Sequence, residues 1–272
     1  MNTTAPATIS LTTDGPVAHL VIDNTARANA LNRSMLDLLA HHLDAVARDR
    51  DIAAVVLAGA GANFSAGLDI AEICEPPAES IEEEFVRVEE ALARCPKPTI
   101  AAVRGHCVGG GTQLAVACDL RVASATARFA ITPAKLGLVY PTSSIDRLVS
   151  IVGPAATKRL IFTADTITAT TALNYGLVTD VVDDQEFDAT VDRIAATVAA
   201  RSPLTIAAAK QMTDQAASEG RVSDELHRHW QAVPNPDLGV GLAAFVARVE
   251  PEFGTSPNEQ GKVLSTNASD IA

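Results

Sequence analysis

The most informative stretch of the chain is Gly105-His106-Cys107-Val108-Gly109-Gly110-Gly111-Thr112-Gln113-Leu114. Its three consecutive glycines follow an apolar run at 99–103 and precede another at 114–117. Glycine is unfavourable inside a helix, because it loses backbone entropy and contributes no side chain to packing. At the start of a helix, however, glycines let another molecule approach N–H groups that lack intrahelical partners and carry partial positive charge. The stretch therefore predicts a helix N-terminus that binds an anion, or an oxygen that becomes anionic during a reaction.

Composition limits the classes of function. The chain has 272 residues, of which 47% are hydrophobic, enough for one large domain or a domain with a helical extension. Its net charge is −12, and no cluster of Lys and Arg is found, which argues against binding to nucleic acid or to anionic membranes. No apolar run reaches transmembrane length, and residues 1–10 do not show the pattern of a signal peptide. We therefore expect a cytoplasmic protein with no nucleic-acid partner and no membrane partner.

The positions of the cysteines and glutamates are typical of structural and not functional roles. Four cysteines show no metal-ligand spacing, which predicts no metal site and buried thiols in a reducing compartment: Cys74, Cys95, Cys107 and Cys118. Glutamates are concentrated in one segment, at Glu79, Glu82, Glu83, Glu84, Glu89 and Glu90. We interpret this acidic segment as the solvated face of a helix.

The periodicity of apolar residues predicts an α/β order of elements. Alternation and buried runs indicate strands, and spacings of three and four indicate helices. The expected strands are 8–13, 17–22, 53–58, 99–103, 119–123 and 177–182. The expected helices include one capped by Ser34 that runs to about Arg48, and one at 81–92. This order predicts an α/β core over 1–200, a helical region over 201–254 and a disordered tail over 255–272.

A second glycine-bearing turn, Phe64-Ser65-Ala66-Gly67-Leu68-Asp69-Ile70, also follows a strand and precedes a helix. The two turns, in this order, resemble the crotonase (enoyl-CoA hydratase/isomerase) superfamily, and the resemblance covers roughly residues 8–253. Supporting matches lie at 28–32, 118–121, 136–138 and 172–178. The resemblance implies an α/β fold, a spiral of ββα turns with a C-terminal helical trimerisation region. It also implies an acyl-CoA thioester substrate, with coenzyme A as part of the substrate and no other cofactor, and a homotrimer or dimer of trimers.

The resemblance also assigns roles in the site. The backbone N–H groups of Leu68 and Gly110 would form an oxyanion hole for the thioester carbonyl oxygen. Two fixed donors bind an enolate better than a neutral carbonyl, and this difference accelerates the reaction. Contacts with the CoA ester are implied for Ala28, Ala30, Ala66, Gly67, Asp69, Ile70, Thr132 and Arg248. Among these, Arg248 matches a position that meets a CoA phosphate, and Asp69 is also interpreted as a helix cap.

The chain departs from the hydratase pattern, in which two glutamates serve as general base and general acid. Gln113 stands at the first position, and Ala134, aligned through Thr132-Pro133-Ala134, stands at the second. Residues 129–140 resemble instead the methylmalonyl-CoA decarboxylase branch, in which a Tyr matches Tyr140 and a Thr matches Thr132. Loss of CO₂ from a malonyl-type thioester forms an enolate without a base. The sequence therefore predicts decarboxylation, with Leu68, Gly110, Gln113 and Tyr140 as the catalytic residues, although that branch carries His in place of Leu68 and Glu in place of Gln113.

Three alternatives remain open. The first is hydration, isomerisation or thioester hydrolysis that uses another group, for which Asp146 and Glu225 are candidates. The second is an acyl-CoA-binding protein without catalysis, which the missing carboxylates suggest. The third is a nucleotide-binding domain, suggested by Gly59-Ala60-Gly61 after a strand, although the third glycine of the dinucleotide-binding motif is missing.

Overall fold

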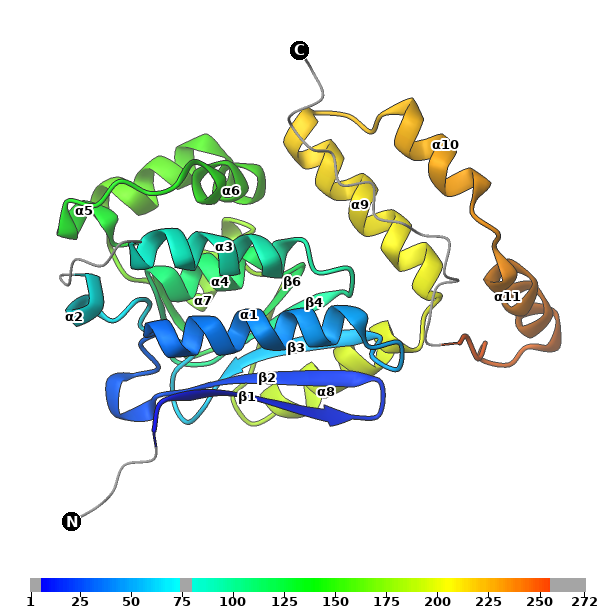
Figure 1. The fold of residues 1–272 in the computed structure, drawn as a ribbon, viewed down its shortest axis with the longest axis horizontal. Coiled ribbons are helices and arrows are strands. Elements are labelled where there is room, and N and C mark those ends of the chain that lie inside the picture. Colours follow the sequence, from blue (N-terminus) through cyan, green and yellow to red (C-terminus); the bar gives the residue numbers. More distant parts are fainter. Residues whose placement is uncertain (1–5, 74–79, 255–272) are drawn as a thin grey trace. The chain divides into compact units, whose positions relative to one another are not determined.

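The computed structural model describes residues 6–73 and 80–254, and the chain divides into two compact units, Met1–Ala200 and Arg201–Ala272 (Figure 1). The tail predicted at 255–272 and Cys74 lie outside the described residues. No helix among the described residues is both long enough and apolar enough to cross a bilayer.

The first unit is built on two sheets. The larger sheet has the order β1 (Thr8–Asp14), β2 (Val17–Asp23), β3 (Ala54–Gly59), β4 (Thr99–Val103), β6 (Leu120–Ser124) and β9 (Asp180–Val182). The smaller sheet has the order β5 (His106–Val108), β7 (Arg128–Ala130) and β8 (Ile167–Thr168). Apart from the antiparallel β1–β2 hairpin, all pairs in the larger sheet are parallel. The chain adds β4 to the larger sheet and β5 to the smaller sheet, and then forms a helix. It repeats this order with β6 and β7, so the chain forms a spiral of ββα turns.

Helices cover both faces of the larger sheet (Figure 1). The α-helices described in this unit are α1 (Arg33–Arg48), α2 (Ile70–Ile73), α3 (Ile81–Ala93), α4 (Gly110–Ala117), α5 (Pro133–Leu136), α6 (Thr142–Thr163), α7 (Ala169–Asn174) and α8 (Phe187–Ala199). Of these, α1 contacts β1 and β2, and α8 contacts β2, β3 and β6. Successive β3 side chains point to opposite faces, so Val55 and Leu57 join the cluster that includes α1 and α3, whereas Val56 joins Phe187 and Val191 of α8. Each such buried side chain contributes roughly 1.5–3 kcal/mol through its removal from water.

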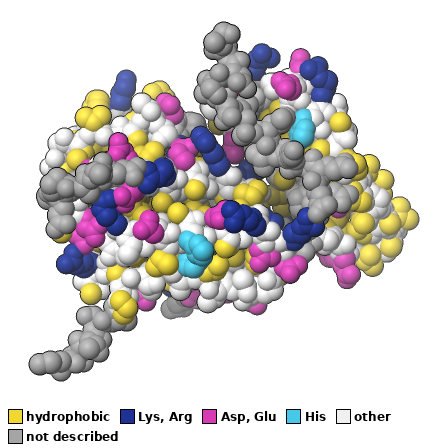
Figure 2. Space-filling view, in the orientation of Figure 1, with side chains coloured by type: hydrophobic (Ala, Val, Ile, Leu, Met, Phe, Trp, Pro, Cys, Tyr) yellow, Lys and Arg dark blue, Asp and Glu magenta, His cyan; other side chains and the backbone are white. Residues whose placement is uncertain are grey.

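The second unit consists of α9 (Pro203–Glu219), α10 (Asp224–Ala232) and α11 (Pro236–Ala247). Each helix begins at a side-chain cap, because Ser202, Ser223 and Asn235 accept hydrogen bonds from backbone N–H groups of the first turn. Hydrophobic side chains gather over α11, among them the exposed Leu238, Leu242, Phe245 and Val246 (Figure 2).

Two expectations from the sequence are wrong. The cap of α1 is Asn32 and not Ser34, since the Asn32 side chain accepts from the Met35 N–H at 2.9 Å and Ser34 only donates to that same oxygen. The acidic segment is not uniformly solvated, because the side chain of Glu89 is fully buried on α3. Burial of Glu89 is tolerated because side chains from α6 neutralise it and donate hydrogen bonds to it.

The expectation for the described cysteines is confirmed. Cys95, Cys107 and Cys118 are buried, and none of these three forms a disulfide.

Candidate active site

Three segments that are distant in sequence lie side by side at the two glycine turns. Residues 64–69 run between 28–31 on one side and 105–108 on the other. On the first side, the Leu31 N–H donates to the Gly67 carbonyl and the Asp69 N–H donates to the Leu31 carbonyl, both at 2.8 Å. On the second side, the Val108 N–H donates to the Ser65 carbonyl at 2.9 Å. These backbone bonds bring the two turns into contact.

Glycine is required at this contact. Gly67 has φ of +94°, and a Cβ there would lie 2.8 Å from both the Gly110 nitrogen and the Val108 carbonyl oxygen. A Cβ at Gly111 would lie 2.5 Å from the Ser65 carbonyl oxygen. Real Cβ atoms do not tolerate such distances, so the glycines allow close approach of backbone to backbone.

The approach leaves two amides without hydrogen-bond acceptors among the described residues. Leu31 forms backbone hydrogen bonds with Gly67 and Asp69, the residues on either side of Leu68. The Leu68 N–H takes no part in this pairing. The Gly110 N–H opens α4 and has no intrahelical acceptor. Neither N–H donates a hydrogen bond to any residue within the described part of the chain. A Cβ at Gly110 would lie 3.3 Å from the Leu68 nitrogen, so the two unused donors are neighbours that can bind one substrate oxygen.

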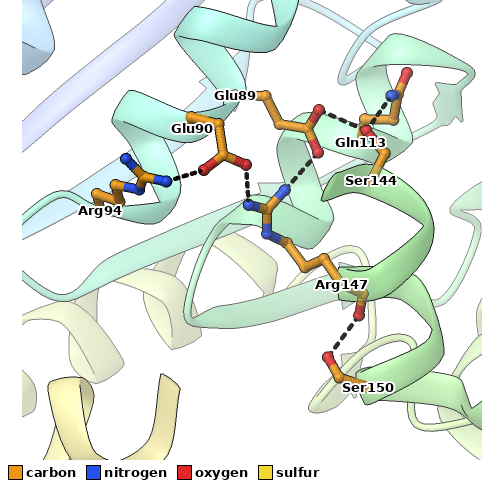
Figure 3. A network of polar contacts seen from close by, with 7 residues as sticks. All are labelled: Glu89, Glu90, Arg94, Gln113, Ser144, Arg147 and Ser150. Atoms are coloured by element: carbon orange, nitrogen blue, oxygen red, sulfur yellow. Dashed lines mark hydrogen bonds and ion pairs between the residues drawn. The ribbon is translucent and has the colours of Figure 1, made fainter. Parts of the chain in front are cut away.

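A buried polar network lies beside the glycine helix (Figure 3). Ser144 Oγ of α6 donates to Glu89 Oε2 at 2.7 Å, and Arg147 Nη1 donates to Glu89 Oε1 at 2.6 Å. Gln113 Nε2 of α4 donates to Ser144 Oγ at 2.7 Å. Arg147 also pairs with Glu90 at 2.7 Å. The network therefore connects α3, α4 and α6 through one buried carboxylate.

Glu89, which the sequence pattern placed on a solvated helix face, is the acidic residue of this network that lies beside Gln113 and Tyr140. Of the alternative candidates, Asp146 is exposed on α6, and Glu225 belongs to the second unit, in the first turn of α10. A signal for Glu89 was available, because it stands four residues after Phe85 and three before Leu92, on the apolar stripe of α3. A carboxylate on such a stripe is a candidate for a buried charge.

Tyr140 faces the same region. It lines a cavity of about 10 Å³, together with Glu89, Thr112, Gln113, Val116, Ile131, Ser144 and Leu148. A cavity of that size holds about one water molecule. The Tyr140 hydroxyl is buried and accepts or donates no hydrogen bond within the described residues.

Burial changes the titration of both acids. It raises the pKa of Tyr140, and the nearby charge of Glu89 raises that pKa further. Burial also raises the pKa of Glu89, although hydrogen bonding from Ser144 and the charge of Arg147 act in the opposite direction. Tyr140 is therefore a neutral donor at physiological pH.

The remaining predicted site residues fall in different places. Ala28 lies in a left-handed turn that follows a short 3-10 helix at Thr25–Arg27, and Ala30 follows two residues later. The Ala66 N–H of the second glycine turn donates to the Ala28 carbonyl at 2.9 Å. The Thr132 hydroxyl oxygen would lie 3.4 Å from a Cβ at Gly109, so Thr132 adjoins the glycine turn. Arg248 is the C-cap of α11 in the second unit.

Two residues at the end of the second turn are also placed. Asp69 is confirmed as a capping residue, because its carboxylate accepts from the Ala71 N–H at 3.1 Å, and it also pairs with Arg27. Ile70, which follows it, is largely exposed.

The spiral of ββα turns and the two glycine turns that meet in it indicate the class of enzyme to which the chain belongs. Residues 12–256 match the family model described as enoyl-CoA hydratase/isomerase, and the chain belongs to this family, whose members act on CoA thioesters. It is 31% identical over 241 residues to the 2,3-dehydroadipyl-CoA hydratase of Escherichia coli K12, covering 86% of this chain and 93% of the relative. It is 36% identical over 209 residues to the short-chain-enoyl-CoA hydratase of Clostridium acetobutylicum, covering 75% of this chain and 79% of the relative.

A solved structure supports the fold assignment. The enoyl-CoA hydratase/carnithine racemase from Magnetospirillum magneticum superposes with a TM-score of 0.85 at 31% identity, covering 91% of this chain and 96% of that one. The predicted crotonase fold is thereby confirmed.

Proposed function

We propose that this enzyme converts an acyl-CoA thioester through an enolate whose oxygen is bound by the N–H groups of Leu68 and Gly110. The observation that carries the proposal is the pair of neighbouring amides that have no acceptor within the described residues. An enolate oxygen carries more negative charge than the carbonyl from which it forms. Two donors held by backbone hydrogen bonds therefore stabilise the transition state more than the ground state.

For the particular reaction, we propose decarboxylation of a malonyl-type CoA ester. The bond between the α-carbon and the carboxylate breaks, its electron pair forms the enolate, CO₂ leaves and a proton is added to the α-carbon. No base is needed, which agrees with an amide at Gln113 and no acid at 132–134. The Tyr140 hydroxyl is neutral and has no hydrogen-bond partner in the described part of the chain, which supports its role as the hydrogen-bonding acid.

Contacts with the CoA portion are proposed for the segments around the second turn, namely Ala28, Ala30, Ala66, Gly67, Asp69 and Ile70, together with Thr132 and Arg248. For Ala28, Ala30, Ala66, Gly67 and Asp69, the support is the backbone pairing of 28–31 with 66–69, which brings the two segments side by side.

A second candidate is hydration or double-bond isomerisation of an enoyl-CoA. The relatives named as hydratases favour it. The structure offers Glu89 as the proton-transfer group, since it lines the same cavity as Gln113 and Tyr140. In this reaction a carboxylate is needed to move a proton.

One screen tests these proposals. The protein is incubated with malonyl-, methylmalonyl-, crotonyl- and 3-enoyl-CoA, while CO₂, enoyl absorbance and free thiol are followed. Release of CO₂ that falls in Tyr140→Phe but not in the matched Tyr175→Phe variant supports decarboxylation. Efficient hydration of crotonyl-CoA contradicts it and supports the second candidate. Tight CoA-ester binding without any product identifies a binding protein and contradicts both.

We also propose that the chain assembles as a homotrimer or a dimer of trimers. The exposed Leu238, Leu242, Phe245 and Val246 of α11 support assembly, because a monomer in water leaves this apolar surface uncovered. Light scattering on the protein and on Phe245→Glu measures the mass. A monomeric wild-type protein contradicts the proposal.

A further inference from the structure

The buried network sets a direction for each of its hydrogen bonds. An ionised carboxylate only accepts hydrogen bonds. One oxygen of Glu89 accepts from Arg147 at 2.6 Å, and the other accepts from the Ser144 hydroxyl at 2.7 Å. Ser144 has a single hydroxyl hydrogen, so donating it to Glu89 leaves its oxygen only as an acceptor.

The direction of these hydrogen bonds fixes the orientation of the Gln113 side-chain amide. Its side-chain amide contains one donor group and one acceptor oxygen, and the two ends have nearly the same shape. At 2.7 Å from an oxygen that can only accept, the end facing Ser144 must be the NH₂ group. The carbonyl oxygen of Gln113 is therefore turned away from Ser144, as Figure 3 shows. This orientation follows from the chemistry of Glu89 rather than from the shape of the amide.

We propose that Glu89 and Ser144 are positioning residues that hold the Gln113 amide in one orientation, so that residue 113 presents a hydrogen-bond acceptor to the substrate. This inference extends the proposed function, since it concerns the same cavity. The presented oxygen recognises a donor, either a water molecule or a hydroxyl of the acyl group. It disfavours an acyl group that places a carboxylate or carbonyl oxygen there, because two acceptors do not bond.

The same geometry gives a reason for glutamine at this position. A glutamate at 113 would place a second carboxylate on Ser144, whose only hydrogen is already given to Glu89. The carboxylate at 113 would then face an oxygen that only accepts and would lie near the like charge of Glu89, which is unfavourable. An amide at 113 therefore fits beside the ionised Glu89, because it can donate to the Ser144 oxygen.

The orientation depends on the charge of Glu89. The charged and titratable groups facing it are Arg147 from α6, Glu90 on its own helix and Tyr140 before α6. Arg147 favours the ionised form. When Glu89 takes up a proton, its OH donates to Ser144, and the Ser144 hydroxyl is released to donate to Gln113. The amide can then turn its NH₂ group outward, so acidification reverses the polarity presented by residue 113.

The test is a side-chain amide NMR experiment that needs no substrate. The chain contains six glutamines, so selective ¹⁵N labelling of their side chains gives few signals, and Gln113→Leu assigns the one of interest. We expect hydrogen exchange of the Gln113 NH₂ group to be at least tenfold faster in Ser144→Ala and in Glu89→Gln than in the wild-type protein. Ser144→Thr, which retains the hydroxyl, restores protection. Glu90→Gln is the matched control, because it removes the other carboxylate paired with Arg147 and leaves the Ser144 bonds in place.

Unchanged protection in Ser144→Ala overturns the inference, even if Glu89→Gln does not fold. A second readout is kinetic: on the thioester that the wild-type protein converts, Ser144→Ala lowers kcat roughly tenfold and Ser144→Thr restores it, as expected for the loss of one positioning hydrogen bond. Equal kcat in Ser144→Ala and wild type overturns the role toward substrate. If no thioester is converted although the amide signals behave as expected, the proposed function fails and the positioning stands.

Discussion

Replacing Gly110 with proline removes one proposed oxyanion donor with little structural disturbance. Gly110 is the first residue of α4, a position where proline is favoured, and its N–H is not used by any described residue. The preceding Gly109 has φ of 54° and ψ of −119°. For achiral glycine, this is the mirror image of the extended conformation preferred before proline. The backbone is therefore ready to accept the ring.

Gly110→Ala is the matched control. Both variants add a Cβ, which would lie 3.2 Å from the Phe85 ring and 3.3 Å from the Leu68 nitrogen. Only proline also removes the N–H, and its ring Cδ takes the place of that hydrogen. Loss of one oxyanion donor costs about 3–4 kcal/mol of barrier, so we expect kcat of Gly110→Pro to be about 10²–10³ lower than that of Gly110→Ala.

The assay measures kcat on the thioester converted in the screen, together with urea unfolding to establish that both variants fold. Because both variants place a Cβ against Phe85, the effect of that contact on kcat is common to both and does not affect their ratio. Equal kcat in two folded variants would refute the assignment of the Gly110 N–H as an oxyanion donor, whatever the reaction.

Three further variants test other parts of the argument. Tyr140→Phe should leave the free energy of unfolding unchanged or raise it by about 1 kcal/mol, because the buried hydroxyl has no partner within the described residues, while turnover falls; a loss of stability would contradict this. Because burial raises the pKa of Glu89 above its ordinary 4.5, the folded state holds that proton more tightly. The free energy of unfolding of the wild-type protein should therefore fall, relative to that of Glu89→Gln, as the pH rises from 4.5 through the raised pKa. Urea unfolding at several pH values measures both free energies. A wild-type free energy of unfolding that rises relative to Glu89→Gln over this range would contradict the shift. Arg121→Leu should cost roughly 3 kcal/mol in the same assay, since the buried guanidinium donates to the carbonyls of Leu177 at 2.7 Å and Cys118 at 2.5 Å; a neutral effect would contradict this.

The local pattern of apolar residues predicted many of the helices and strands. The strand predicted at 99–103 is β4, Thr99–Val103, because five apolar or small residues between Pro98 and Arg104 leave little other choice. The three-residue strands β5 and β7 were not predicted, since three residues are too few to show alternation. Their identity as strands depends on pairing with each other, at Cys107 and Phe129.

The site was predicted unevenly for the same reason. The two glycine turns carry their own signal, because glycine is chosen where backbone must approach backbone. The partners of Gln113 carry no local signal: Glu89 and Ser144 are 24 and 31 residues away in sequence and come from different helices. The carboxylate was therefore assigned to solvent, although its helical register already placed it among apolar side chains.

The sequence by itself determined where the chain turns, which stretches are buried and which two glycine turns lie between a strand and a helix, because these depend on the conformational range of glycine and on the period of apolar residues. Only the tertiary structure decided that the bends touch, that Glu89 is buried and that the Gln113 amide faces one way. Contacts between distant segments arise from how helices and sheets pack together, and no spacing along the chain encodes the direction of a single hydrogen bond.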